Sequence, residues 1–321
     1  MSVERIVEIA SDNRHLAALR GFMTVSEGRE ELGRIPLDDI SAVIANAHGL
    51  TYSNNLLTAL AKRGAPFVIC GANHAPAAFL WSVDGHYMQS ARLEAQINAT
   101  QPRAKQLWKQ IIQSKIKGQA GVLESLNKSK NPVEALAAKV RSGDPENIEG
   151  QAARRYWSIL FGDDFRRNRN LAGENALLNY GYTIIRSGVA RALLASGLHP
   201  GIGIHHRNAY NPMRLVDDVM EPYRPFADFV VWHLTNEGCY DVTPDAKRLL
   251  AAMMEMAVSM KDGIYPMRLA IQKTAQSLAK IYEDNDGRLD LPVSTPPLWK
   301  AQEEGYGIFE RAQTDVDDGD V

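Results

Sequence analysis

The sequence predicts an α+β multidomain fold, with a small N-terminal β-rich domain followed by a larger all-α domain. Short β-branched or alternating segments broken by turn residues fill the first ~90 residues, and apolar residues recur at helical spacing from about Met88 onward. A chain of 321 residues is long enough for one to two domains. We therefore divide it into a β-rich domain (1–90), an α-helical domain (91–300) and an acidic tail (301–321) that we expect to be flexible.

The β-rich domain is expected to contain short strands on either side of one helix. Three strand candidates precede the helix, and they are Arg5–Ala10, His15–Val25 and Ile40–Ala45. Either Ser53 or Thr51 can cap the helix, and Gly64 ends it. A buried strand is expected to follow at Pro66–Cys70 because this segment is short and apolar.

The helical domain is marked by caps and by apolar residues at helical spacing. Asp144 caps a helix with a proline at its first position, and this helix is expected to run to Ile159. Thr243 caps another helix in the same way. That helix is expected to hold four methionines, Met253, Met254, Met256 and Met260. Three more helices are expected, at Glu174–Ser196, Leu215–Leu234 and Pro266–Asp284. Pro222 lies inside the second of these three and is expected to kink it.

The overall composition is that of an ordinary soluble globular protein, with 45% apolar and 23% charged residues. No apolar run approaches the roughly 20 residues that span a bilayer, and the N-terminus lacks the basic flank and apolar stretch of a secretion signal. The two cysteines, Cys70 and Cys239, exclude a disulfide framework and a cysteine-rich zinc site. We therefore expect a cytoplasmic protein without a membrane anchor.

Charge is unevenly distributed along the chain, although the net charge is only −2. Bases outnumber acids from Arg103 to Arg169, whereas the tail carries Asp315, Asp317, Asp318 and Asp320. A basic face can bind nucleic acid, because Lys and Arg displace the counterions that are condensed on phosphates. A solvated charged surface would show the same distribution.

The first candidate site segment is EGQAARRYW, which begins at Glu149. Glu149, Ala153 and Tyr156 are spaced i, i+4 and i+7, so they share one face of the predicted helix. With Arg154 and Arg155 beside them, the carboxylate and the phenol can face an anionic ligand. A surface glutamate on an amphipathic helix is the alternative reading of this segment.

The second candidate segment is a glycine-rich loop, GLHPGIGIHH, that ends in His205 and His206. Neighbouring side chains of an extended segment point to opposite faces, so at most one of the two imidazoles should enter a given site. Imidazole is a common ligand of transition metals. Alternatively, both rings make hydrogen bonds within a turn.

The third candidate segment is the acidic cluster DDVMEPYRP, which begins at Asp217. Asp218 and Glu221 are spaced i, i+3 and share a helical face, where two like charges repel unless a cation or an arginine intervenes. Arg224 extends the same face. The alternative interpretation is an exposed first turn of a helix, where acidic residues are also common.

Together the three segments predict a mixed oxygen and nitrogen site for a metal ion. Two carboxylates and one imidazole suit Mg²⁺ or Mn²⁺ with several waters retained, and they suit zinc or structural calcium less well. A metal ion in such a site orients a scissile phosphate, offsets charge in the transition state and activates the attacking oxygen. The segments therefore predict phosphodiester chemistry.

Four segments, in this order, resemble the CRISPR-associated integrase that inserts new spacers during antiviral defence, in its type II form. They are EGQAARRYWSILFG (149–162), NYGYTIIRS (179–187), GIHH (203–206) and DDVMEPYRP (217–225). The N-terminal region is similar to that family only in general character, as a β-rich half that leads into helices.

The resemblance implies that Glu149, His206 and Glu221 are the catalytic residues and that they hold Mg²⁺ or Mn²⁺. The choice of His206 over His205 comes from the family's spacing between this histidine and the final acid. Asp218 and Arg224 are implied as supporting residues.

The resemblance also implies contacts with DNA. Tyr156 is a candidate phosphate contact, and a buried core tyrosine is the alternative. Contacts with backbone phosphates are expected from Arg154, Arg155, Arg166 and Arg167.

The assembly implied by the resemblance is a homodimer built partly through the N-terminal domains. Two such dimers would flank a dimer of a smaller, ferredoxin-like adaptation subunit, with double-stranded protospacer DNA lying across the assembly. The implied reaction is strand transfer, in which a 3′-hydroxyl attacks a phosphodiester at the boundary of a CRISPR repeat. Two alternatives stay open: a non-catalytic DNA-capture scaffold of the same fold, and an unrelated metal-dependent phosphodiesterase without strand transfer.

Overall fold

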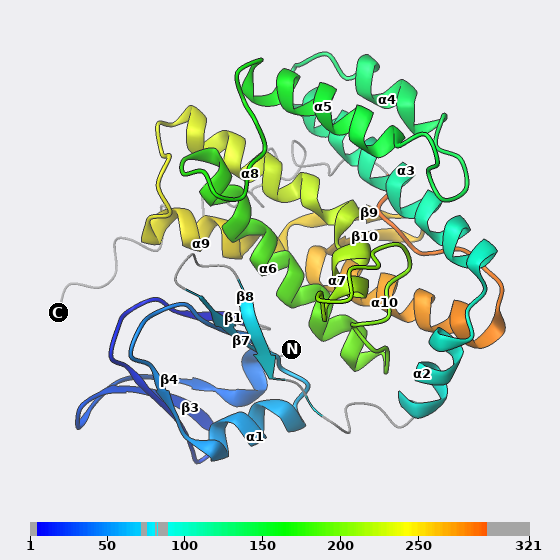
Figure 1. Cartoon of the computed structure of the whole chain (residues 1–321). Coiled ribbons are helices and arrows are strands. Elements are labelled where there is room, and N and C mark those ends of the chain that lie inside the picture. The colour runs from blue at the N-terminus through cyan, green and yellow to red at the C-terminus, as the bar shows by residue number, and fades with distance from the viewer. Residues whose placement is uncertain (1–4, 72–75, 81, 83–88, 294–321) are drawn as a thin grey trace.

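A computed structural model of the chain describes residues 5–71, 76–80, 82 and 89–293. The N-terminal part is built from two β-sheets and one helix, and the C-terminal part is built mainly from helices (Figure 1). The predicted fold class is therefore confirmed. The predicted acidic tail, residues 301–321, lies outside the described residues, and the division at residue 90 stays a prediction.

Two four-stranded sheets make up the N-terminal part. The first has the order β1 (Arg5–Ile9), β5 (Ile40–Ala45), β7 (Phe67–Cys70) and β8 (Pro76–Leu80). Its first three strands run parallel, and β8 is antiparallel to β7. The second has the order β4 (Glu30–Pro36), β3 (Phe22–Glu27), β2 (His15–Leu19) and β6 (Thr51–Tyr52). Helix α1 (Asn54–Lys62) connects β6 to β7.

The predicted single strand at His15–Val25 is wrong, because the chain reverses within it. Arg20 and Gly21, between β2 and β3, have φ angles of 50° and 86°. Two consecutive positive φ angles suit the tight turn of a two-residue β-hairpin. The two strands then pair antiparallel, with Leu19 opposite Phe22.

One apolar core joins both sheets to α1. Leu56 of α1 belongs to the same buried cluster as Phe67 of the first sheet and Leu16 of the second. Of the two predicted caps, Ser53 is the one used: its hydroxyl accepts the backbone N–H of Leu56 at 3.2 Å. Thr51 lies in β6 instead.

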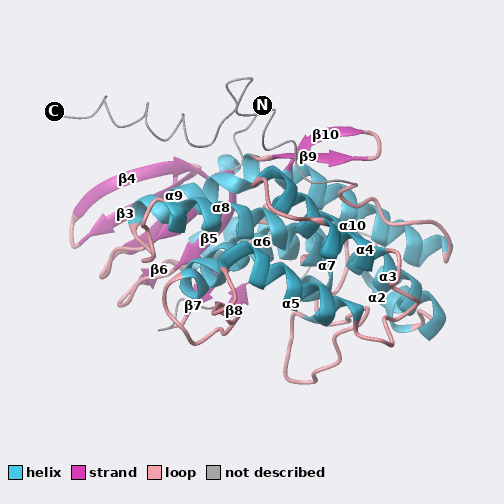
Figure 2. Ribbon diagram, turned by 90° about the horizontal axis from the view of Figure 1, so that it is seen from above, coloured by secondary structure: helices cyan, strands magenta, loops and turns pink. Residues whose placement is uncertain are grey.

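Helices dominate the rest of the described chain. They are α2 (Gln89–Ile97), α3 (Gln101–Ser125), α4 (Asn131–Ala137), α5 (Ile148–Phe161), α6 (Glu174–Ala195), α7 (Arg214–Val219), α8 (Arg224–Asn236), α9 (Pro244–Ala252) and α10 (Met267–Asp284). Helix α6 is central and contacts α7, α8, α9, α10 and strand β5 (Figure 1). Viewed from above, the strands of the two sheets lie toward one end of the molecule, and α2, α3, α4 and α10 lie toward the other (Figure 2). Within the described residues, no helix combines the length and apolar character needed to span a membrane.

The two parts of the chain meet at Glu8 on β1. Its carboxylate accepts a hydrogen bond from Asn46 at 2.7 Å and another from the hydroxyl of Tyr180 on α6. Lys247 of α9 lies 3.2 Å from the same carboxylate. Tyr180, in the second of the four motif segments, therefore joins the helices to the sheet.

Helix α5 begins three residues later than predicted, at Ile148. Asn147 adopts a left-handed conformation (φ 50°) and caps the helix by accepting the backbone N–H of Gly150. The Asp144 carboxylate still contributes, because it accepts the backbone N–H groups of Ile148 and Glu149 at 2.8 and 3.0 Å. These contacts fix the first turn of α5, where Glu149 lies.

The predicted helix at Leu215–Leu234 is broken into three pieces. Helices α7 and α8 are separated by a 3₁₀ turn, Glu221–Tyr223. Pro222 lies within this turn and has no backbone N–H to continue a helix, so the expected interruption at Pro222 is confirmed. Pro225 falls in the first turn of α8, where a helix does not require that donor.

The methionine-rich segment adds a short β-hairpin to the helical domain, where the sequence predicted a continuous helix. Helix α9 ends at Ala252, and the chain then forms a β-hairpin from β9 (Ala257–Met260) and β10 (Gly263–Pro266). The buried residues alternate along this segment, at Met254, Met256, Val258 and Met260. An alternation of two is the period of a strand, so the predicted helix through Met260 is wrong.

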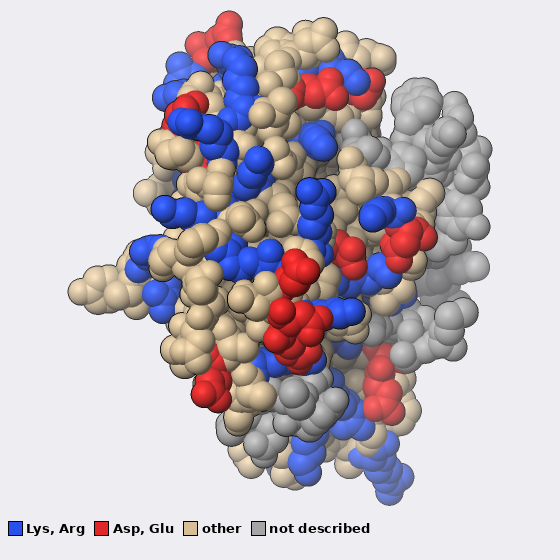
Figure 3. Space-filling model, turned by 90° about the vertical axis from the view of Figure 1, so that its right-hand side faces the viewer, with Lys and Arg blue, Asp and Glu red and all other residues tan. Residues whose placement is uncertain are grey.

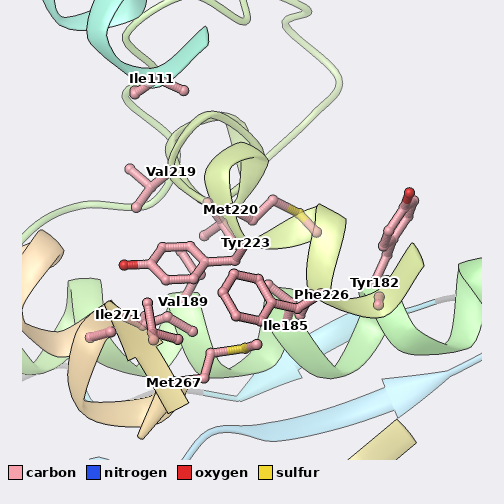
Figure 4. Packing of buried hydrophobic residues seen from close by; sticks show 14 of the residues in the cluster. Ile111, Tyr182, Ile185, Val189, Val219, Met220, Tyr223, Phe226, Met267 and Ile271 are labelled. Atoms are coloured by element: carbon pink, nitrogen blue, oxygen red, sulfur yellow. The ribbon is translucent and has the colours of Figure 1, made fainter. Parts of the chain in front are cut away.

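A large apolar core holds the Glu221–Tyr223 turn in place. Figure 4 shows Tyr223 and Phe226 packed against side chains of α6 and α10, including Val189 and Ile271. The Tyr223 hydroxyl is satisfied by Thr274 Oγ1 at 2.7 Å. Since these side chains are buried, moving the turn requires opening the core.

Candidate active site

Helix α3 approaches the Glu221–Tyr223 turn closely at Gly118. A Cβ atom at this position would lie 3.1 Å from Cγ of Pro225, in the first turn of α8, and 3.8 Å from the carbonyl oxygen of Pro222 in the Glu221–Tyr223 turn. Lys115, one turn earlier on α3, lies beside Glu221. The glycine at position 118 therefore permits close packing of α3 against the segment that carries Glu221.

Lys115 bridges the two acids that the sequence singled out. Its Nζ lies 2.5 Å from Oε1 of Glu149 and 2.6 Å from Oε2 of Glu221. Burial lowers the pKa of Lys115, but the charges of Glu221 and Glu149 outweigh burial and raise it above the ordinary lysine value. The two carboxylates therefore converge on one cation, the lysine ammonium.

Glu221 is the more buried of the two acids, with 4% of its side chain exposed. Its Oε1 lies 3.0 Å from the guanidinium of Arg224, which also stacks over the Tyr182 ring at 4.8 Å. Burial raises the pKa of Glu221, but Arg224 and Lys115 together reverse this and lower it. Oε2 contacts the lysine ammonium at 2.6 Å.

The Asp218 carboxylate binds the backbone of the loop that carries the two histidines. This fully buried carboxylate accepts the backbone N–H groups of Ile204, His205 and His206 at 2.6, 3.0 and 3.2 Å. Its Oδ1 also lies 2.6 Å from Nδ1 of the His206 ring. That hydrogen bond raises the pKa of His206 above the ordinary histidine value. With Nδ1 engaged in this way, Nε2 is the nitrogen left for another partner.

The two histidine rings have different surroundings. His205 stacks flat on Trp108 of α3, with ring centroids 4.1 Å apart and 3° between the planes. His206 meets the same indole edge-on. Burial lowers the pKa of His205. One histidine therefore packs against an aromatic ring, while the other is oriented by a carboxylate.

Tyr156 is fully buried, so the suggestion that it contacts a phosphate is wrong and the alternative of a core tyrosine holds. Its hydroxyl donates to Asp228 at 3.0 Å, and Tyr182 donates to the other oxygen of that carboxylate at 2.5 Å. Burial raises the pKa of Asp228 to about 7. Tyr156, Tyr182 and Asp228 form a buried cluster that adjoins Arg224, because the Arg224 guanidinium stacks over the Tyr182 ring.

The four arginines expected to contact DNA differ in exposure. Arg154, Arg155 and Arg166 are exposed, and the first two line a cavity of about 380 Å³ at the start of α5. Arg167 is half-buried and donates to the side chains of Asn175 and Asn179. Lys and Arg are abundant on the face in Figure 3, where a compact acidic group interrupts them.

The chemistry of the donors fits a divalent cation, although the side chains as they stand do not form a complete set. Glu149 and Glu221 already share one cation, and the free nitrogen of His206 is a third potential ligand. In the part of the chain that the structure describes, no three His, Cys, Asp or Glu side chains are close enough to hold one metal ion. Lys115 takes the space between the two acids.

Three residues of the site were not predicted from the sequence. Lys115 was counted only as part of the basic segment, and Trp108 and Asp228 were not considered. Asp228 could have been noticed, because it is an acid among the apolar residues of α8. The other two lie on α3, far along the chain from the acids, and no local spacing marks them.

Solved structures share this fold. A casposase bound to integration product aligns with a TM-score of 0.75 at 18% identity, over 89% of this chain and 92% of that one. A Cas1 protein from Thermotoga maritima aligns with a TM-score of 0.70 at 16% identity, over 87% of this chain and 97% of that one. At these identities the likeness supports the fold alone.

Sequence comparison identifies the family. The family model described as CRISPR associated protein Cas1 matches residues 7–247. The CRISPR-associated endonuclease Cas1 of Neisseria meningitidis is 36% identical over 267 residues, which cover 82% of this chain and 88% of that protein. A second relative of that name, from Pyrobaculum aerophilum, is 29% identical over 85% of this chain and 98% of its own length. The chain therefore belongs to the Cas1 family of CRISPR-associated proteins.

Proposed function

We propose that this chain is a metal-dependent DNA integrase that inserts protospacer DNA into a CRISPR array. In this reaction a 3′-hydroxyl attacks a phosphodiester at the repeat boundary. The observation that carries the proposal is the convergence of Glu149 and Glu221 on one cation position. Family membership supports it, because relatives are named endonucleases and a structural neighbour is a casposase bound to integration product.

Glu149, His206 and Glu221 are the proposed metal ligands and catalytic residues, and Mg²⁺ or Mn²⁺ is the proposed ion. Two facts support this set: the acids already share a cation, and Nδ1 of His206 is held by Asp218. A metal ion bound there would offset charge on the phosphate and activate the attacking oxygen.

The surrounding residues would position these ligands. Asp218 sets which nitrogen of His206 is free, and Arg224 holds one oxygen of Glu221. Arg154 and Arg155 are exposed on α5, and Arg166 is exposed in the loop that follows it. These three residues would hold the DNA backbone without reading its sequence. Arg167 is already engaged within the protein and is a weaker candidate for this role.

The proposed assembly follows the family. We propose a homodimer that uses the β-rich domain, joined to a smaller ferredoxin-like adaptation subunit and to double-stranded DNA. One solved neighbour is a Cas6-RT-Cas1–Cas2 complex, and this chain aligns with it at a TM-score of 0.70 and 18% identity. The alignment covers 36% of that longer chain.

The test is strand transfer of a short 3′-hydroxyl duplex into supercoiled DNA that carries the repeat, with the partner subunit present. We expect joined products with Mn²⁺, none with a chelator, and recovery when Mn²⁺ is added back. Glu221→Gln, which keeps the side-chain shape but removes a charged ligand, should abolish joining. Cleavage without joining would instead favour a metal-dependent phosphodiesterase.

A non-catalytic DNA-capture scaffold is the second candidate. The observation that favours it is Lys115, which fills the space between the two acids. A scaffold would bind the duplex normally and yield no joined product at any Mn²⁺ concentration. Glu221→Gln would then bind the duplex with the wild-type affinity and would likewise yield no joined product.

A further inference from the structure

Lys115 provides a positive charge where the proposed function requires a metal ion. The ammonium contacts both acids at once, at 2.5 and 2.6 Å, with 11% of the lysine side chain exposed. Lys115 lies on α3, which packs closely at Gly118 against the segment that carries Glu221. The contact is therefore a built feature of the fold.

The charges at this place balance without a metal. Glu149 and Glu221 carry two negative charges, and Lys115 and Arg224 carry two positive charges within 3.0 Å of them. A divalent cation added to this set would leave an excess of two positive charges in a buried site. Such an excess is strongly unfavourable in a region of low dielectric.

A metal ion on these two acids would compete with the ammonium. Lys115 already contacts one oxygen of each carboxylate, at 2.5 and 2.6 Å. A divalent cation that bound the same carboxylates would be repelled by the ammonium charge and would share their electron pairs with it. Binding of the metal is therefore opposed by Lys115 in its present position.

We propose that Lys115 is a built-in counter-ion that keeps Glu149 and Glu221 paired in the metal-free protein and competes with the divalent cation for them. This inference rests on the proposed metal site and goes beyond it, because it assigns a residue that opposes metal binding. Lys115 thereby weakens the apparent affinity for the metal, while it stabilises the empty site against repulsion between the acids.

The test is a calorimetric titration of the full chain with Mn²⁺ alone, at one fixed pH. Lys115→Met should bind Mn²⁺ about tenfold or more tightly than the wild type, because the competing charge is gone. The melting temperature of its metal-free form should fall by several degrees, and Mn²⁺ should raise it by more than it raises that of the wild type. Lys115→Gln, which can still donate to the acids, is the second variant if the methionine variant does not fold.

Lys117→Met is the matched control, because Lys117 lies exposed on the same helix. It should leave the Mn²⁺ affinity and the melting temperature unchanged. The inference is overturned if the Lys115 variants bind Mn²⁺ no more tightly than the wild type while Glu221→Gln abolishes binding. If Glu221→Gln binds as the wild type does, or if no form binds Mn²⁺, the proposed metal site fails and the inference fails with it.

Discussion

Asp218 and His206 are joined by a 2.6 Å contact between Oδ1 and Nδ1. The same carboxylate accepts the backbone N–H groups of Ile204, His205 and His206. One buried acid therefore fixes both the path of the loop and the orientation of one ring. The sequence marked Asp218 as a second acid of the site, and the structure gives it a positioning role.

Asp218→Asn should weaken the site while the fold remains. An amide keeps one acceptor oxygen and replaces the other with a donor. It therefore cannot accept both the backbone N–H groups of Ile204 and His205 and the Nδ1–H of His206. We expect Mn²⁺ affinity and strand transfer to fall by about 10–100-fold, as for other carboxylates that orient a metal-binding histidine. Asp217→Asn is the control, since Asp217 pairs with Arg186 instead. Equal losses in both variants would contradict the assigned role.

Gly203→Ala should distort the histidine loop. A Cβ atom there would lie 2.6 Å from the carbonyl oxygen of His206 and 3.0 Å from Oδ2 of Asp218, so the loop must shift. We expect the free energy of unfolding to fall by about 1–3 kcal/mol, together with a loss of strand transfer. Gly33→Ala, which adds a Cβ in open space, is the control for chemical denaturation. A Gly203 variant as stable and active as the wild type would mean that the loop does not depend on this close packing.

The buried Asp228 should make stability depend on pH. Burial raises its pKa to about 7. A carboxyl with a raised pKa binds more protons in the folded than in the unfolded chain, so its contribution is most favourable below the unfolded pKa and is lost as pH rises through about 7. At about 1.4 kcal/mol per pKa unit, the loss between roughly pH 4 and pH 8 is about 4 kcal/mol.

Asp228→Asn should flatten that dependence, because an amide does not titrate in this range. The measurement is the free energy of unfolding by denaturant between roughly pH 5 and pH 8, at constant salt. Asp245→Asn, at an exposed acid, should follow the wild-type curve. A steep fall that persists in Asp228→Asn would place its source elsewhere.

The segments that carry the proposed ligands could be predicted from the sequence because each depends on local residues. The helix start before Glu149, the glycine-rich loop before His206 and the break at Pro222 all depend on neighbouring residues. The hairpin at Arg20 and Gly21 and the strand through Met260 were missed. At Arg20 and Gly21, two positive φ angles turn the chain between apolar residues on either side. Before Met260, burial at every second residue gives a strand.

The contacts that complete the site could not be read in this way. Lys115 and Trp108 lie on α3 and reach Glu149 and His205 only after the helices pack. The spacing of Tyr156 and Glu149 places both residues on one face of α5. How far each side chain is exposed to solvent depends on the elements that pack against the helix. Packing leaves Glu149 partly exposed and buries Tyr156 against Asp228.

The exposed arginines should contribute to DNA affinity without contributing to stability. Arg154→Gln should weaken duplex binding and reduce the slope of log affinity against log salt by about 1. Arg167→Gln should instead lower the melting temperature, because Arg167 bonds Asn175 and Asn179. Fluorescence anisotropy at several salt concentrations and thermal melting separate the two effects. An unchanged salt slope in Arg154→Gln would remove this residue from the DNA-binding surface.

The two adjacent histidines allow the most direct test of the metal-dependent integrase. Strand transfer of a 3′-hydroxyl duplex into supercoiled repeat DNA is compared in Mn²⁺ for the wild type, His206→Ala and His205→Ala. We expect His206→Ala to abolish joining, because the ring held by Asp218 is the proposed ligand, and His205→Ala to retain it, because that ring packs on Trp108. Joining that survives in His206→Ala at the wild-type rate would contradict the proposed site and, with it, the proposed mechanism.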